Sequence, residues 1–134
     1  MKTGADDEKS IEMRIEEYQT MYNRYKILNK GNKYDYRLFW KCGITFSELL
    51  YLIAKQSGKC RVCDVPLSFG RGSSSICVDH DHRCCPSKRC CGKCIKGILC
   101  SHCNKLLGFS YNDVNILRKA ILYLENYYVR KSEG

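Results

Sequence analysis

Two short cysteine motifs constrain the fold of this chain more than any other feature. One reads C-R-V-C at residues 60–63, and the other reads C-S-H-C at residues 100–103. Each has the C-x-x-C spacing of a zinc knuckle, and four thiolates complete the tetrahedral shell of a structural zinc ion. The predicted ligands are Cys60, Cys63, Cys100 and Cys103. Because the protein would fill all four positions, this zinc would hold distant segments together and would not be a catalytic metal.

The chain has eleven cysteines, which could also indicate a secreted disulfide framework. That count is odd, and the amino-terminal residues are charged, without the apolar segment of a secretory signal. No apolar run reaches the length of about 18 residues that a membrane-spanning helix needs. We therefore expect a cytoplasmic protein that binds zinc under reducing conditions and has no membrane partner.

The positive charge of the chain is concentrated after residue 17. The whole chain has a formal net charge of +9, but residues 1–17 contain six acidic and three basic residues. Residues 18–134 therefore carry a formal +12, which a zinc tetrathiolate of charge about −2 reduces only slightly. A surplus of this size indicates a polyanionic partner such as DNA, although solubility alone would also account for it.

The amino-terminal part of the chain is predicted to be helical. Apolar residues recur at helical spacing over about residues 10–28. They are Ile11, Ile15, Tyr18, Tyr22 and Tyr25. This face could pack on its own domain or form the seam of a homodimer. Thr45 begins a T-x-x-E capping box, so a second, short helix should run from there to Gly58 and lead into the first cysteine motif.

The two cysteine motifs enclose a predicted hairpin that a helix follows. Residues 66–75 are rich in Gly and Ser and should form a loop, and strands are expected at 76–78 and 96–99. A short helix should then cover 101–107 and end at Gly108, and Asn112 should cap a last helix. We therefore expect an α+β fold with a zinc-pinned ββα core, flanked by N- and C-terminal helices.

Candidate catalytic residues lie in V-D-H-D-H at residues 78–82. Asp79 can hold a hard divalent cation, and His80 can take up a proton near pH 7. Asn104, directly after the second cysteine motif, could offer another oxygen ligand. Successive residues of a strand face opposite sides, so the side chains of Asp79 and His80 would point to different faces unless the strand ends within the motif. An isolated Asp-His pair is usually a surface ion pair or a helix cap. Between two cysteine motifs on a basic chain, Asp79, His80 and Asn104 together indicate phosphodiester hydrolysis.

Four segments in this order resemble a known family. W-K-C-G-I-T-F-S-E-L-L-Y-L-I-A-K-Q-S-G-K-C leads into C-R-V-C, and V-D-H-D-H and K-G-I-L-C-S-H-C-N-K-L-L-G follow. Over about 36–128 the chain resembles the phage recombination endonuclease VII family, a branch of the His-Me finger (HNH, ββα-metal) nucleases. The resemblance implies a nuclease domain at residues 36–134, preceded at 1–35 by a helical element for packing or dimerisation.

The resemblance also implies roles for the residues of the site. Asp79 and Asn104 would bind a catalytic Mg²⁺ or Mn²⁺. His80 would be the general base that activates water, and His82 would contact the phosphate or assist the leaving group. Asp81 has no implied role beyond orienting a neighbour. Because family members cut DNA with a single metal ion, we expect a metal-dependent DNA endonuclease. Branched DNA is a candidate substrate, and the host-cell cytoplasm is the expected location for a protein of phage origin.

Five further cysteines lie in R-C-C-P-S-K-R-C-C-G-K-C at residues 83–94. Four of them could bind a second zinc ion, which would leave Cys90 spare. That second set is Cys84, Cys85, Cys91 and Cys94. A redox-labile disulfide or a reactive thiol are alternatives, because the neighbouring Lys88, Arg89 and Lys93 would lower thiol pKa values. The same bases could contact a DNA backbone beside the catalytic strand.

Two other functions remain open for this sequence. A nicking or homing-type HNH endonuclease would act on duplex DNA rather than on junctions. A non-catalytic zinc module for DNA binding would need the knuckles and the basic surface, but it would have no use for Asp79, His80 and Asn104 together.

Overall fold

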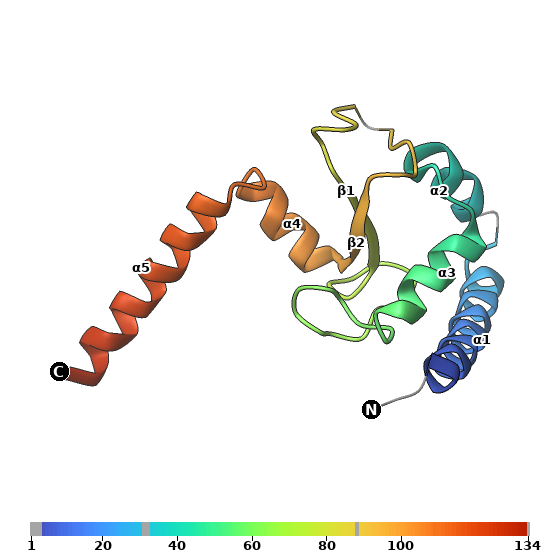
Figure 1. The fold of residues 1–134 in the computed structure, drawn as a ribbon, viewed down its shortest axis with the longest axis horizontal. Coiled ribbons are helices and arrows are strands. Elements are labelled where there is room, and N and C mark those ends of the chain that lie inside the picture. The colour runs from blue at the N-terminus through green and yellow to red at the C-terminus, as the bar shows by residue number, and fades with distance from the viewer. Residues whose placement is uncertain (1–3, 31–32, 88, 134) are drawn as a thin grey trace. The chain divides into compact units, whose positions relative to one another are not determined.

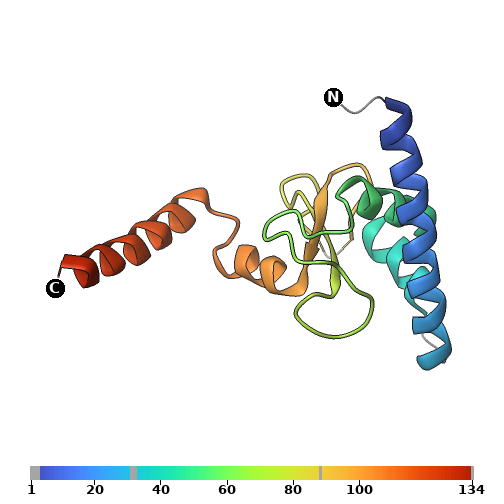
Figure 2. The same cartoon turned by 90° about the horizontal axis from the view of Figure 1, so that it is seen from below.

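Helix α3 contacts both the long amino-terminal helix and a small β-hairpin (Figure 1, Figure 2). The computed structural model describes residues 4–30, 33–87 and 89–133. Its elements are α1 (Gly4–Leu28), α2 (Tyr34–Cys42), α3 (Phe46–Lys55), β1 (Ile76–His80), β2 (Ile95–Cys100), α4 (Ser101–Phe109) and α5 (Val114–Glu133). Helices with one two-stranded sheet make an α+β fold, which confirms the predicted fold class. The chain forms two compact units, Met1–Cys103 and Asn104–Gly134, and the division expected at residue 36 stays a prediction.

Helix α1 buries part of its predicted apolar face within the first unit. Tyr18 and Tyr22 are buried, and the Tyr18 hydroxyl donates a hydrogen bond of 2.7 Å to the carbonyl oxygen of Gly58. The ring centroid of Tyr22 lies 4.1 Å from that of Phe46 on α3. The helix begins at Gly4, earlier than the predicted residue 10. The face therefore packs on its own unit, and its alternative use as a homodimer seam stays a prediction.

Helix α2 is an element that the sequence patterns did not predict. Leu38 is its buried residue, and Lys33 at its N-terminus makes no side-chain capping bond, so neither periodicity nor a cap signals the helix. Its end is better marked. Gly43 adopts a left-handed conformation with φ of 68°, and its N–H donates to the carbonyl oxygen of Phe39, as at many helix C-termini.

Helix α3 forms where the capping box predicted it and supplies the centre of the core. The Thr45 hydroxyl accepts from the N–H of Glu48, and the Glu48 carboxylate accepts from the N–H of Thr45. The helix ends at Lys55, before the predicted end at Gly58. The fully buried apolar side chains of the core come from α3, β2 and the loop between α3 and β1. They are Leu49, Ile53, Leu67 and Ile98.

The hairpin pairs β1 and β2 in an antiparallel register that contains one bulge. Ile76 pairs with Cys100, and the pairing continues regularly to Asp79 opposite Gly97. The next residue, His80, pairs with Ile95. Residue 96 is therefore the extra residue of the bulge, a feature that re-aims side chains locally. Both strands are longer than predicted, and β1 ends at His80, within the V-D-H-D-H motif.

The second unit contains most of α4 and all of α5, and two predicted boundaries there are wrong. Gly108 lies inside α4, which runs to Phe109. Asn112 adopts a left-handed φ of 54° before α5, and the Asp113 carboxylate instead accepts from the N–H of Asn115 at 2.8 Å. The N-terminal bonding partner of α5 is thus one residue later than predicted.

Among the described residues, no helix is both long enough and apolar enough to cross a membrane.

Candidate functional site

The four cysteines of the C-x-x-C motifs come together at the base of the hairpin. Their Sγ atoms all lie within 4.8 Å of one another, and those of Cys63 and Cys100 are 3.7 Å apart. Zinc–sulfur bonds of about 2.3 Å in a tetrahedron separate the sulfurs by about 3.8 Å. Backbone N–H groups also point at these sulfurs, that of Cys103 to Cys100 Sγ at 3.4 Å. The donor set therefore fits zinc, as the sequence predicted.

Electrostatics in this first cluster favour metal binding. Burial raises the pKa of Cys60, but hydrogen bonds from surrounding backbone N–H groups and from the Cys100 thiol outweigh it and lower the pKa to about 6. Burial and hydrogen bonds with the other sulfurs raise the pKa of Cys103. One negative charge is thus concentrated on Cys60, and a divalent cation would displace the protons that the other thiols hold.

A second group of four cysteines comes together in the loop between β1 and β2. It consists of Cys84, Cys85, Cys91 and Cys94, as predicted, with all Sγ atoms within 4.8 Å of one another. The Cys91 sulfur is 4.0 Å from that of Cys84 and 3.8 Å from that of Cys94. Cys90 is outside this group and buried, although its sulfur lies 3.6 Å from that of Cys94. The spacing again fits a zinc tetrathiolate.

The thiols of this second cluster also differ from one another in pKa. The backbone N–H of Lys93, 3.4 Å from Cys91 Sγ, together with neighbouring sulfurs, lowers the pKa of Cys91 to about 7. Hydrogen bonds with the other three sulfurs, that of Cys94 foremost, raise the pKa of Cys84 to about 12. The cluster therefore holds its negative charge mainly on Cys91.

The bulge in the hairpin brings a lysine to Asp79. Asp79 is 8 % exposed, and its Oδ2 lies 3.3 Å from Nζ of Lys96, the extra residue on β2. A nearly buried carboxylate needs a compensating charge, which the lysine supplies in this structure. Lys96 could not be predicted as a partner of Asp79, because a bulge that turns one strand residue toward its neighbour leaves no recognisable pattern in the sequence.

His80 lies at the end of β1 beside His82 and beside the cysteine loop. The Nε2 atom of His80 is 3.2 Å from the carbonyl oxygen of Cys85, and the centroids of the two imidazole rings are 4.4 Å apart. Because β1 ends at His80, the alternation of a regular strand does not extend through His82. The structure thus brings the two predicted histidines together.

Asp81 organises the turn that follows β1. Its carboxylate accepts from the backbone N–H of Arg83 at 2.9 Å and lies 3.4 Å from the Arg83 guanidinium. The hydrogen bond from the Arg83 N–H is the main cause that lowers the pKa of Asp81. The side-chain contacts of Asp81 are thus with its own turn, which is consistent with an orienting role.

Asn104 lies in α4, directly after Cys103, and belongs to the second unit. Its predicted role as a metal ligand together with Asp79 stays a prediction.

Basic and aromatic side chains meet on α2. The Arg89 guanidinium lies 4.7 Å above the ring of Trp40, within the range of a cation–π contact. These two residues line a cavity of about 400 Å³ with Tyr36, Arg37 and Lys41. Of the loop bases predicted to contact DNA, Arg89 and Lys93 are exposed, and Lys88 lies outside the described residues.

The chain matches the model of a known protein family over most of its length. Residues 35–126 match the family model described as recombination endonuclease VII. The chain belongs to the recombination endonuclease VII family. No curated protein and no solved structure matches the chain. Family membership indicates a DNA endonuclease, and the two cysteine clusters fit zinc.

The catalytic divalent ion that the resemblance implies stays a prediction, and Asp79 has the chemistry to hold one. Its carboxylate is a hard oxygen donor of the kind that Mg²⁺ and Mn²⁺ bind, and it lies almost buried at the end of β1. The lysine beside it shows that this position already attracts positive charge.

Proposed function

We propose that this endonuclease VII family member hydrolyses DNA phosphodiester bonds with His80 as the general base. The observation that carries the proposal is the hydrogen bond of His80 with the Cys85 carbonyl. A carbonyl oxygen can only accept, so Nε2 of His80 is the donor and carries the proton. Nδ1 of the neutral ring is then unprotonated, and it can take a proton from the water whose oxygen attacks phosphorus.

Asp79 and Asn104 would hold one divalent ion, Mg²⁺ or Mn²⁺. The ion would neutralise charge on the scissile phosphate and on the leaving oxygen. The residues of the chain supply the rest. Lys96 holds the Asp79 carboxylate in place through its ion pair of 3.3 Å. His82, with its ring 4.4 Å from that of His80, would contact the phosphate or protonate the leaving group.

The substrate of this site would be DNA, with branched recombination intermediates as the first candidate. The family description, a recombination endonuclease, supports that substrate. The formal charge of +12 on residues 18–134 supports a polyanion in general. A His-Me finger mechanism, a homodimer and a place in the host cytoplasm belong to the same proposal.

The test compares the wild-type protein with His80→Ala on a supercoiled plasmid and on a four-way junction. Each substrate is incubated with and without Mg²⁺ or Mn²⁺, and nicked, linear and resolved products are separated on gels. We expect metal-dependent cleavage that His80→Ala lowers by about 10²–10⁴-fold, the usual contribution of a general base. Preference for the junction would identify a resolving enzyme, and preference for the plasmid a nicking enzyme.

Binding measurements on the same two proteins separate catalysis from recognition. His80→Ala should keep its zinc content and its DNA affinity, because it removes a proton acceptor and leaves the basic surface unchanged. A parallel loss of cleavage and of DNA binding would contradict the general-base assignment. Binding without cleavage by the wild-type protein would instead identify a zinc-dependent DNA-binding module.

A further inference from the structure

The residue that orients His80 belongs to the second cysteine cluster. Nε2 of His80 bonds to the backbone carbonyl of Cys85, whose own sulfur is one of the four in that cluster. The backbone N–H groups of Cys84 and Cys85 both donate to the carbonyl oxygen of Asp81, at 3.1 and 3.0 Å. The first part of the loop is thus tied directly to the residues that follow β1.

The end of the loop returns to the same place. The backbone N–H of Asp81 donates to the carbonyl oxygen of Cys94 at 2.9 Å. The N–H of Cys91 donates to Cys85 Sγ at 3.3 Å, which joins the two arms of the loop. Both arms of the loop therefore meet beside the imidazole of His80, and all four cysteines of the cluster take part in these contacts.

The loop has almost no buried apolar side chains that could hold this arrangement. Cys84 and Cys91 are exposed, Cys85 and Cys94 are half-buried, and the loop contributes Cys90 as its buried apolar residue. A hydrophobic core large enough to fix the backbone is lacking among the described residues 81–87 and 89–94. Four sulfurs at tetrahedral spacing would do so, because a bound metal ion replaces core burial as the source of local folding energy.

We propose that a zinc ion held by the second cysteine cluster positions His80 for catalysis. Cys84 and Cys85 are consecutive, so metal bonds to both sulfurs restrain the peptide between them and the carbonyl that follows. That carbonyl is the acceptor for Nε2 of His80. The zinc thereby sets the direction of the imidazole and leaves Nδ1 toward the substrate. Cys85 is a positioning residue that acts through its backbone.

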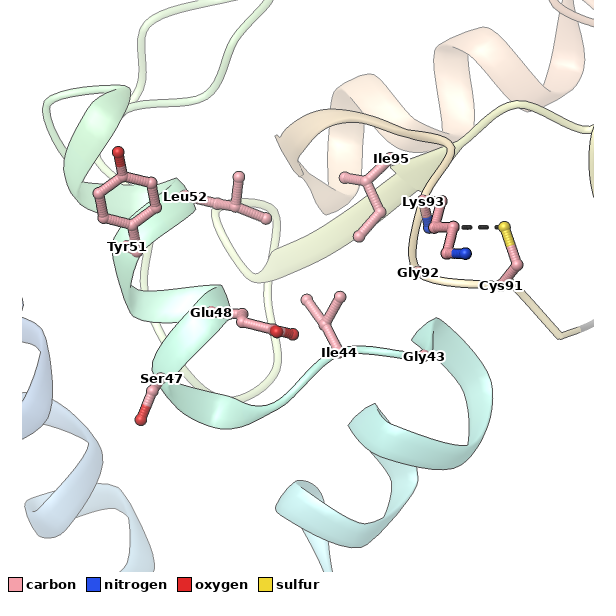
Figure 3. Close-up of a pocket in the computed structure, with 10 residues that line it drawn as sticks. All are labelled: Gly43, Ile44, Ser47, Glu48, Tyr51, Leu52, Cys91, Gly92, Lys93 and Ile95. Carbon is pink, nitrogen blue, oxygen red and sulfur yellow. Dashed lines mark hydrogen bonds between the residues drawn. The ribbon is translucent and has the colours of Figure 1, made fainter.

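The loop is also anchored to the rigid part of the first unit. The N–H of Cys90 donates to the carbonyl oxygen of Lys41 at the end of α2, at 2.8 Å. Gly92 packs against the backbone of Gly43, and a Cβ on either glycine would collide with the other segment. Figure 3 shows these two glycines side by side, with the bond from Lys93 to Cys91 beside them. The metal would therefore fix His80 relative to the scaffold as well as to the loop.

The inference rests on the proposed role of His80, and its test uses the full chain in two variants. Cys90→Ala is the parent, since it removes the spare thiol that could replace a lost ligand. The test variant adds Cys84→Ala, which deletes one sulfur and keeps the Cys85 carbonyl. Zinc per chain is measured by metal analysis, and the nitrogen protonation of His80 is measured by long-range ¹H–¹⁵N NMR of the histidine rings.

We expect two zinc ions per chain and a pure Nε2–H form of His80 in the parent. The test variant should keep one zinc ion, show His80 as a mixture of tautomers, and lose cleavage by about 10–100-fold, the usual effect of losing an orienting partner. Its DNA affinity should be unchanged. A folded test variant with one zinc ion, an unaltered Nε2–H signal and full cleavage would overturn the inference, and so would a parent with one zinc ion.

The zinc and NMR measurements do not depend on activity. If the parent binds two zinc ions and holds the Nε2–H form only while both are bound, yet cuts no DNA, then the positioning is correct and the proposed function fails. If His80→Ala abolishes cleavage but the tautomer is the same with one zinc ion as with two, then the function stands and this inference fails.

Discussion

Each of the two cysteine clusters offers zinc four sulfurs, but the surroundings of the two clusters are very different. In the first cluster Cys60, Cys100 and Cys103 are buried and Cys63 is exposed, and Cys100 directly follows the buried Ile98 and Leu99 on β2. In the second cluster two cysteines are exposed and two half-buried, in a loop with almost no apolar side chains of its own. The donor chemistry is identical, but the first metal would be part of the core and the second would stand in place of one.

Four thiolate ligands alone therefore do not determine the role of a zinc ion, because that role also depends on which segments the ion would hold. Around the first cluster, cysteines from the end of β2 and from residues 101–103 meet those of the segment that follows α3, all within the first unit, so the ion would hold the ends of the hairpin. Around the second, the ion would hold the backbone beside His80. Loss of the first should therefore affect the whole first unit, and loss of the second should affect the active site.

Removal of a ligand from the first cluster should have the largest effect on folding. Cys103→Ala should remove most of the free energy of zinc binding at this cluster. In small zinc sites that free energy is on the order of 10 kcal/mol and contributes directly to folding. We expect loss of the cooperative thermal transition and of dispersed NMR signals. Cys42→Ala is the matched control, because this half-buried thiol belongs to neither cluster and should cost only about 1 kcal/mol. A well-folded Cys103→Ala protein would show that the hairpin does not need the metal.

Chelation of the wild-type protein should separate the two ions in time. The second cluster should release its zinc first, because a chelator can reach Cys84 and Cys91. In the first cluster Cys63 is exposed, but the other three sulfurs are buried and require local unfolding. We expect two phases of zinc release with a chromogenic chelator, and loss of cleavage with the first phase. Circular dichroism should change only in the second. If zinc release, cleavage activity and circular dichroism all changed in a single phase, the two zinc sites would not differ in stability or in role.

Gly92→Ala tests the docking of the exposed cluster without touching a sulfur. The residue has φ of 81°, and the added Cβ would collide with the Gly43 carbonyl, so the loop should move at a cost of about 1–3 kcal/mol. We expect weaker binding of the second zinc and slower cleavage, measured by competition with a chelator and by plasmid nicking. Gly108→Ala is the control, because nothing lies within 4 Å of its added Cβ. Equal effects of both changes would refute a specific role for the contact between the glycines.

Alkylation of protein from which a chelator has removed only the zinc of the second cluster should distinguish the clusters by access and by charge. The pKa of Cys91 is lowered to about 7, so its thiolate is nearly complete at pH 8 and scarce at pH 6. Its labelling by iodoacetamide should therefore fall about tenfold over that range, because the thiolate is the nucleophile. Cys60 has an even lower pKa of about 6 but is 1 % exposed, so it should label slowly at both pH values. Peptide mass spectrometry reports both rates, and fast labelling of Cys60 would mean that the first cluster opens as soon as the second cluster loses its metal.

The outline of the fold could be predicted from local signals. The T-x-x-E box predicted α3, the helical stripe predicted α1, and the Gly- and Ser-rich loop placed the hairpin. Helix α2 could not be predicted, because it buries only Leu38 and has no side-chain cap at its start. The boundaries at Gly108 and Asn112 were wrong because helix ends depend on which side chain captures the free backbone groups, here that of Asp113.

Within the site, motif spacing predicted both cysteine clusters, and the resemblance implied the roles of His80 and Asp79. Spacing could not predict the contact of Lys96 with Asp79, since it depends on a bulge between two strands. It also could not predict that His80 bonds to the backbone of Cys85, because a main-chain carbonyl leaves no trace in the residue type.

The amino-acid sequence by itself determined the chemistry of this protein: two sets of four thiolates, an Asp-His pair and a strongly basic chain. Residue type and spacing indicate them, because a C-x-x-C turn or two consecutive cysteines bring a pair of sulfurs together locally. Only the tertiary structure decided which cluster is buried, which is exposed, and which backbone group meets the imidazole of His80. Those relations arise between strands and loops that are distant in the chain, where packing and register place the atoms.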